Sequence, residues 1–147
     1  MEIKMNKARL QMEKVLRSFA RIQSNSADDQ AYDDLMHFFE DCWHLKDYAK
    51  VCLPPTQQKQ LEEEVEKCKH LKIVADIANR SKHAELKRKR GDADITHKYI
   101  RTYDGANPSP ATAKYTITLQ DGSSYDVHDV AREAIAEWQT IITKYKL

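Results

Sequence analysis

The scarcity of glycine and proline limits most strongly how this chain can fold. The 147 residues include only three Gly and four Pro, the two residue types that most often interrupt regular structure. Their scarcity favours long regular elements, mainly helices, over a scaffold that is rich in loops. The length suits one hydrophobic core, so we expect residues 1–147 to form a single domain.

Apolar residues recur at helical spacing as far as about residue 90. The expected helices span about 2–23, about 28–50, about 56 to near 70, and about 71–87. The first helix should bury an apolar stripe that comprises Ile3, Leu10, Val15, Leu16, Phe19 and Ile22. The second should end before Pro54-Pro55, because proline cannot donate a backbone hydrogen bond and disfavours helix in the residue before it.

The pattern changes after Gly91. Residues 97–105, 114–120 and 123–127 are expected to be strands, residues 105–111 a loop, and Asp121-Gly122 a tight hairpin turn. A last helix, capped by Asp126 or His128, should cover this sheet, since a lone hairpin is weak in water. The fold class is therefore α+β and mainly α. An antiparallel helical bundle over residues 1–90 precedes a small three-stranded antiparallel sheet and a C-terminal helix over residues 91–147.

Charge and cysteine content favour a cytoplasmic protein. The net charge of +1 provides no global attraction to nucleic acid or to a membrane. Cys42, Cys52 and Cys68 form no C-x-x-C pair and are expected to be reduced thiols. No secretory signal and no run of roughly 18 apolar residues is present, so no membrane partner is expected. Gly-rich nucleotide motifs are absent as well, and we expect no cofactor.

The second expected helix carries a polar set of His37, Asp41, His44 and Tyr48. Spacings of four, three and four residues place them on one side of the helix. Imidazole and carboxylate groups arranged in this way can bind a metal or perform acid–base chemistry. The alternative is a solvated polar face. Because a zinc site needs a third or fourth ligand and no H-E-x-x-H pattern occurs, we expect no metal.

The fourth expected helix carries a second polar set, Asp76, Asn79, Arg80 and His83. An arginine beside a histidine can hold a phosphate and move a proton, which is what a metal-independent ribonuclease needs. His83 or His44 would be the base, Arg80 the phosphate clamp and Asn79 the orienting residue. The alternatives are an exposed face, or an Asn–His pair satisfied between helices. If the second and fourth helices pack side by side, His44 and His83 converge.

Basic residues are concentrated locally despite the near-zero net charge. The candidate nucleic-acid-binding residues are Lys82, Lys87, Arg88, Lys89 and Arg90. The first helix adds Lys7, Lys14, Arg17 and Arg21 on a face of its own. Such groups can neutralise phosphates. The alternative for the run at 87–90 is a solvated helix end, where cations suit the helix dipole.

Three phrases carry a resemblance: FFEDCWHLKDYAK (38–50), IANRSKHAEL (77–86) and LQDGSSYDVHDVAREAIAEW (119–138). Together they resemble a family of small uncharacterised bacterial proteins that share an H-L-K-D-aromatic helix, an N-x-S-K-H helix and a strand–D-G–strand–helix ending. The helical part is also similar to the HEPN superfamily, helical bundles that include ribonuclease toxins and phage-defence proteins. In the HEPN motif four to six residues separate an Arg and a polar residue from a His, whereas two residues separate Arg80 from His83.

The resemblance implies a cytoplasmic bacterial protein that contacts RNA or a cognate protein. The setting would be a toxin–antitoxin or phage-defence system. If the protein is instead a non-enzymatic interaction module, its homodimer would be built from the faces of the bundle. Two functions stay open: a metal-independent ribonuclease, and a non-enzymatic protein–protein interaction module.

Overall fold

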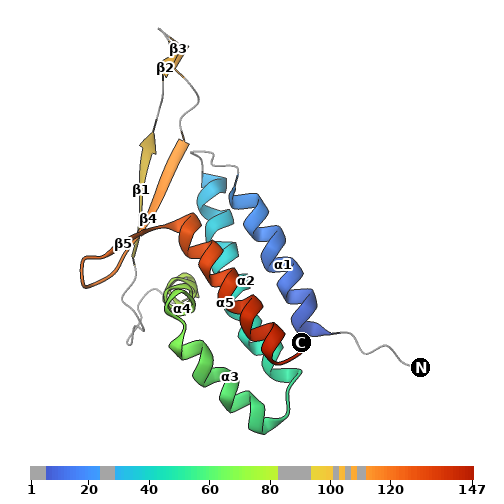
Figure 1. Ribbon diagram of the computed structural model, residues 1–147. Coiled ribbons are helices and arrows are strands. Elements are labelled where there is room, and N and C mark those ends of the chain that lie inside the picture. The colour runs from blue at the N-terminus through green and yellow to red at the C-terminus, as the bar shows by residue number, and fades with distance from the viewer. Residues whose placement is uncertain (1–5, 24–28, 83–93, 101–102, 105–106, 109–111) are drawn as a thin grey trace.

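The computed structural model describes residues 6–23, 29–82, 94–100, 103–104, 107–108 and 112–147. The protein is mainly helical with a small antiparallel sheet (Figure 1), as predicted. The elements are α1 (Lys7–Ile22), α2 (Asp29–Val51), α3 (Pro55–Lys67), α4 (Lys69–Lys82), β1 (Asp94–Ile100), β2 (Tyr103–Asp104), β3 (Asn107–Pro108), β4 (Thr112–Thr118), β5 (Ser124–Asp126) and α5 (Val127–Lys144). Within the described ranges, no helix has both the length and the apolar character needed to cross a lipid bilayer.

Local side chains fix where two helices begin. The Asn6 side chain accepts a hydrogen bond from the Arg9 amide at 3.0 Å and so caps α1. Asp126 caps α5 by accepting from the amides of His128 and Asp129 at 2.9 and 3.2 Å. Of the two residues predicted to cap the last helix, Asp126 and His128, it is therefore Asp126 that does so.

Two short connections set the course of α2, α3 and α4. The Pro54-Pro55 pair separates α2 from α3, and Pro55 is the first residue of α3, where a missing N–H costs no helical hydrogen bond. Cys68 then separates α3 from α4 with extended backbone at φ −85° and ψ 112°. The break that the sequence placed near residue 70 is therefore at Cys68.

The buried face of α1 differs from the predicted stripe. Val15 and Ile22 are buried, but Leu10 and Leu16 are 43% and 42% exposed, so the prediction is wrong for these two leucines. The residues that α1 buries are Ala8, Gln11, Met12, Val15, Ser18 and Ile22. Two of these are polar, because α2 presents a polar partner to this face of α1, as the site geometry below shows.

The core is centred on α2, α4 and α5, and α5 is part of the helical bundle. Trp138 of α5 is fully buried, and its Nε1 donates a hydrogen bond to the carbonyl oxygen of Cys42 in α2 at 3.0 Å. We expected the last helix to cover the sheet, but α5 packs chiefly on α4 and makes fewer contacts with β4 and β5. Tyr115 and Ile117 of β4 are buried and extend the core toward the sheet.

The sheet has the antiparallel order β1-β4-β5. Gly122 in the β4–β5 turn has φ +90°, a conformation that favours glycine, and the Leu119 amide closes the turn on the Ser123 carbonyl at 2.9 Å. The β1–β4 hairpin projects away from the helices and carries the β2–β3 pair at its end (Figure 1). The predicted loop at residues 105–111 therefore includes the short strand β3.

Helix α4 is buried on almost every side. Leu71 and all residues from Ile73 to Ala78 are buried, since α4 contacts α2, α3 and α5. Asp76 is only 1% exposed. The interpretation of Asp76 as part of a solvated polar face is therefore wrong: the helices packed around α4 cover it.

The N-terminus of α4 is capped from α5. Glu137 Oε1 accepts a hydrogen bond from the Leu71 amide at 3.0 Å. Glu137 Oε2 lies 2.9 Å from His70 Nδ1 and 3.5 Å from the His70 amide nitrogen. A carboxylate at this position satisfies helix amides that have no partner within the helix and complements the helix dipole.

Replacing Glu137 with alanine should therefore destabilise the fold. We expect Glu137→Ala to lower the free energy of unfolding by about 1–3 kcal/mol, the usual effect of removing a charged hydrogen-bond acceptor from a helix N-terminus. Urea denaturation followed by circular dichroism measures this change. Glu133→Ala is the matched control, because Glu133 is exposed one turn earlier on α5. Equal effects of the two substitutions would contradict the capping role.

A second substitution tests the core around α5. Trp138→Phe removes the hydrogen bond to the Cys42 carbonyl and leaves unfilled volume, so we expect a loss of about 1–3 kcal/mol in unfolding free energy. Gln139→Ala, at an exposed neighbouring position, should change stability by less than about 0.5 kcal/mol. Trp43 remains as the fluorescence probe in both variants. A Trp138→Phe protein as stable as the unmodified chain would refute this account of the core.

Candidate functional site

A pocket of ≈150 Å³ lies between α2 and α4. Its lining residues are Glu40, Trp43, His44 and Asp47 of α2 with Ala78 and Asn79 of α4. Glu40, His44 and Asp47 follow one another at spacings of four and three positions, and Trp43 lies three positions after Glu40, so all four lie on one side of the helix. The mixture of imidazole, carboxylate, amide and indole groups makes this pocket a candidate site for acid–base chemistry.

Helices α2 and α4 pack against each other, which was the condition for His44 and His83 to converge. The pocket brings together two of the four candidate catalytic residues, His44 and Asn79, both half-buried. His83 and the side chain of Arg80 lie outside the described residues. The pairing of His44 with His83 and the clamp role of Arg80 therefore stay predictions. The candidate nucleic-acid contacts also stay predictions. Lys82 is described in its backbone alone, and Lys87, Arg88, Lys89 and Arg90 lie outside the described residues.

The polar set of the second helix does not form one site. His37 and Tyr48 are exposed and His44 lines the pocket, whereas Asp41 is buried and faces α1. Among the residues that the structure describes, no group of three or more His, Cys, Asp or Glu side chains is placed to hold a metal ion. Of this set, His44 alone reaches the α2–α4 pocket.

Asp41 belongs to a buried polar seam between α1 and α2. Its Oδ2 accepts a hydrogen bond from Ser18 Oγ at 2.6 Å, and its backbone carbonyl accepts from Gln11 Nε2 at 2.8 Å. Lys14 Nζ lies 3.4 Å from Asp41 Oδ1, and Arg21 Nη2 donates to Ser18 Oγ at 2.7 Å. The sequence reasoning missed this seam, although Gln11 and Ser18 lie seven residues apart on the buried side of α1, a spacing that could have shown it.

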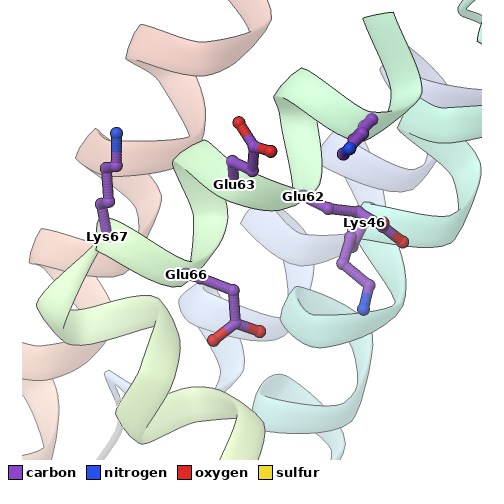
Figure 2. A pocket seen from close by; sticks show the side chains of 6 residues that line it. Lys46, Glu62, Glu63, Glu66 and Lys67 are labelled. Carbon is purple, nitrogen blue, oxygen red and sulfur yellow. The ribbon is translucent and has the colours of Figure 1, made fainter. Parts of the chain in front are cut away.

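A larger groove of ≈570 Å³ separates α2 from α3. It is lined by Lys46, Lys59, Glu62, Glu63, Glu66 and Lys67. Figure 2 shows Lys46 and Glu66 extending in one direction while Glu63 and Lys67 extend in the other. Next to the groove, Lys50 pairs with Glu62 and holds the pKa of that carboxyl below its usual value. Because its opposite charges are balanced and do not converge on one point, this groove is a weaker candidate site than the smaller pocket.

The buried thiols are unsuited to nucleophilic catalysis. Cys68 lies two residues before His70 and near Glu137. These are the residue types of a Cys–His–Glu catalytic triad, in which the cysteine would be the nucleophile. Burial, and then the charge of Glu137, raise the pKa of the Cys68 thiol. Burial raises the pKa of Cys42 further above its usual value. Both groups are therefore held as neutral thiols, whereas the thiolate is the nucleophilic form.

Comparisons of the chain with protein-family models, with curated proteins and with solved structures found no match. The function is therefore argued from the α2–α4 pocket and from the charged surfaces around it.

All three cysteines are free thiols, and their exposure predicts an order of chemical labelling. Cys52 is exposed, Cys68 is half-buried and Cys42 is fully buried. We expect iodoacetamide to label Cys52 first, Cys68 more slowly, and Cys42 only after unfolding, because access and thiolate character both control the reaction. Peptide mass spectrometry of a labelling time course measures the three rates, and Cys52→Ser should remove the fast phase. Labelling of Cys42 in the folded protein at the rate of Cys52 would contradict the structure.

Proposed function

We propose that this protein is a cytoplasmic HEPN-like protein that binds RNA and cleaves it without a metal at the α2–α4 pocket. The observation that carries the proposal is the position of His44 and Asn79 on opposite walls of one pocket. Asp47 lies three residues after His44 on the same wall, where its carboxylate can orient the imidazole. Imidazole, carboxylate and amide groups suffice for proton transfer in RNA cleavage, with no metal ligand required.

In this mechanism His44 takes the proton from a ribose 2′-hydroxyl. The 2′-oxygen then attacks the adjacent phosphorus, and the bond from phosphorus to the 5′-oxygen breaks. A 2′,3′-cyclic phosphate remains on one product, and the departing 5′-oxygen takes up a proton. Asn79 would hold the ribose or phosphate in place, and Arg80 would neutralise the charge that develops on the phosphate.

The size of the pocket agrees with a small part of an RNA chain as its occupant. A volume of ≈150 Å³ equals that of about five water molecules in the liquid. It is smaller than the roughly 300–1,000 Å³ of sites that take a whole drug-sized ligand. Trp43 adds an aromatic ring to the lining, a group that contacts bases in RNA-binding proteins, and Lys46 Nζ lies 4.5 Å from the centre of this ring.

A second candidate function rests on the carboxylate of Asp47. This exposed side chain places negative charge beside His44, which attracts a cation. The same pocket could therefore receive a Lys or Arg side chain of a cognate protein, next to Trp43. In that case the protein is a non-enzymatic interaction module.

Cleavage of a structured RNA in EDTA separates these two functions. We expect cleavage by the unmodified protein and a rate at least about 100-fold lower for His44→Ala, the usual effect of removing a general base. His37→Ala is the matched control, because His37 is exposed on the same helix outside the pocket. With saturating RNA it should cleave at the unmodified rate, because His37 contacts none of the reacting atoms.

His83→Ala extends the same experiment to the second candidate base, and we expect it to abolish cleavage as well. Thermal melting of each variant shows whether the fold is retained. Absence of cleavage by the unmodified protein, with unchanged melting temperatures in the variants, would reject the ribonuclease and favour the interaction module.

A further inference from the structure

Four basic side chains follow one exposed face of α1. This basic stripe comprises Lys7, Lys14, Arg17 and Arg21, all exposed. At 1.5 Å per residue the stripe extends for about 21 Å along the helix. All four side chains belong to the part of the chain that the structure describes.

The polar seam holds two of the four cations in place. Asp41, only 8% exposed, lies 3.4 Å from Lys14 Nζ. Ser18, which donates to Asp41, accepts a hydrogen bond from Arg21 at 2.7 Å. The buried carboxylate of Asp41 therefore orients Lys14 directly and Arg21 through Ser18. Such an arrangement lowers the entropy that these side chains would lose when they bind an anion.

The other two cations are available to a ligand. Lys7 and Arg17 form no ion pair and no side-chain hydrogen bond with any residue that the structure describes. Lys7 and Arg17 therefore carry positive charge that no ion pair within the described residues compensates. An extended polyanion fits a line of cations better than a compact anion does.

The stripe and the pocket lie on the two flanks of α2. Asp41 faces α1 and His44 faces α4. At 100° per residue, the exposed side chains of His37 and Tyr48 lie between those two directions. Asp41 and His44 are three residues apart on α2, which places them about 60° apart around the helix and about 4.5 Å apart along its axis, a separation that a short stretch of single-stranded nucleic acid can span.

We infer that the basic stripe binds the phosphate backbone of single-stranded RNA and that the strand crosses the His37–Tyr48 ridge of α2 to present one nucleotide to the α2–α4 pocket. The identity of the polyanion rests on the proposed function, whereas the stripe rests on its own geometry. Phosphates on one side of the scissile bond then contact α1, while the scissile phosphate stays beside His44.

Binding of a 2′-O-methyl RNA tests the stripe without cleavage, because this oligonucleotide keeps every phosphate but lacks the attacking hydroxyl. Fluorescence anisotropy between 50 and 200 mM salt gives the Kd and its salt dependence. We expect the double substitution Lys7→Gln, Arg17→Gln to weaken binding about tenfold and to reduce the slope of log Kd against log salt by about 1.4, since each contact to a single strand contributes about 0.7. Neither side chain has a described partner, so the fold should not change.

Arg9→Gln is the matched control. Arg9 is exposed on α1 but lies about a third of a turn away from the stripe, and its substitution should leave the Kd and the slope unchanged. An unchanged Kd in the double variant, or an equal loss in Arg9→Gln, would overturn the inference. Competition by polyglutamate as strong as by RNA of the same charge would overturn the assignment to RNA.

The outcomes also separate this inference from the proposed function. Stripe-dependent RNA binding by a protein that does not cleave RNA would support the stripe and reject the ribonuclease. Cleavage that needs His44, together with RNA binding that is insensitive to the stripe, would support the ribonuclease and overturn the stripe.

Discussion

The contact of Glu137 with the start of α4 is the interaction on which the remaining arrangement depends. A helix that buries Leu71 and every residue from Ile73 to Ala78 cannot leave its first amides without acceptors, since unpaired polar groups are costly away from water. The acceptor comes from α5, 66 positions after Leu71 in the chain. Because α4 supplies one wall of the pocket, the position of Asn79 opposite His44 depends on this capping contact.

Helix α2 separates two polar regions of opposite character. On one flank, the buried Asp41 orients Lys14 directly and Arg21 through Ser18. On the other flank, His44 faces Asn79 across the pocket. A buried polar seam adds little net stability compared with apolar packing, but it fixes how two helices lie against each other. The seam thus sets the position of α1, and with it the cations that α1 presents beside α2.

The sequence was sufficient where structure depends on neighbouring residues. The cap at Asp126, the break at Pro54-Pro55 and the turn at Gly122 follow from local chemistry and could be predicted. The burial of Asp76 and the exposure of Leu10 could not, because they depend on which distant helices cover each face.

For the candidate site as well, features set by neighbouring residues could be predicted and features set by distant helices could not. Periodicity placed His44 on a polar face, but the pocket also needs Trp43 and Glu40, which the helical pattern alone does not distinguish from ordinary surface residues. The seam partner of Asp41 lies on another helix, 23 residues earlier in the chain. A seven-residue spacing of polar groups on α1 was the one local sign of that contact.

The charges of the pocket and of the basic stripe are most easily understood together. The carboxylates of Glu40 and Asp47 in the pocket disfavour any phosphate beyond the one at the scissile bond, since like charges a few ångströms apart repel strongly when water is partly excluded. The stripe lies on α1, whereas those carboxylates lie on the side of α2 that lines the pocket with α4. The cations can therefore hold other phosphates of the backbone outside the pocket. The pocket is then left to receive a base or a ribose hydroxyl, groups that carboxylate, amide and indole side chains can bind without a formal positive charge.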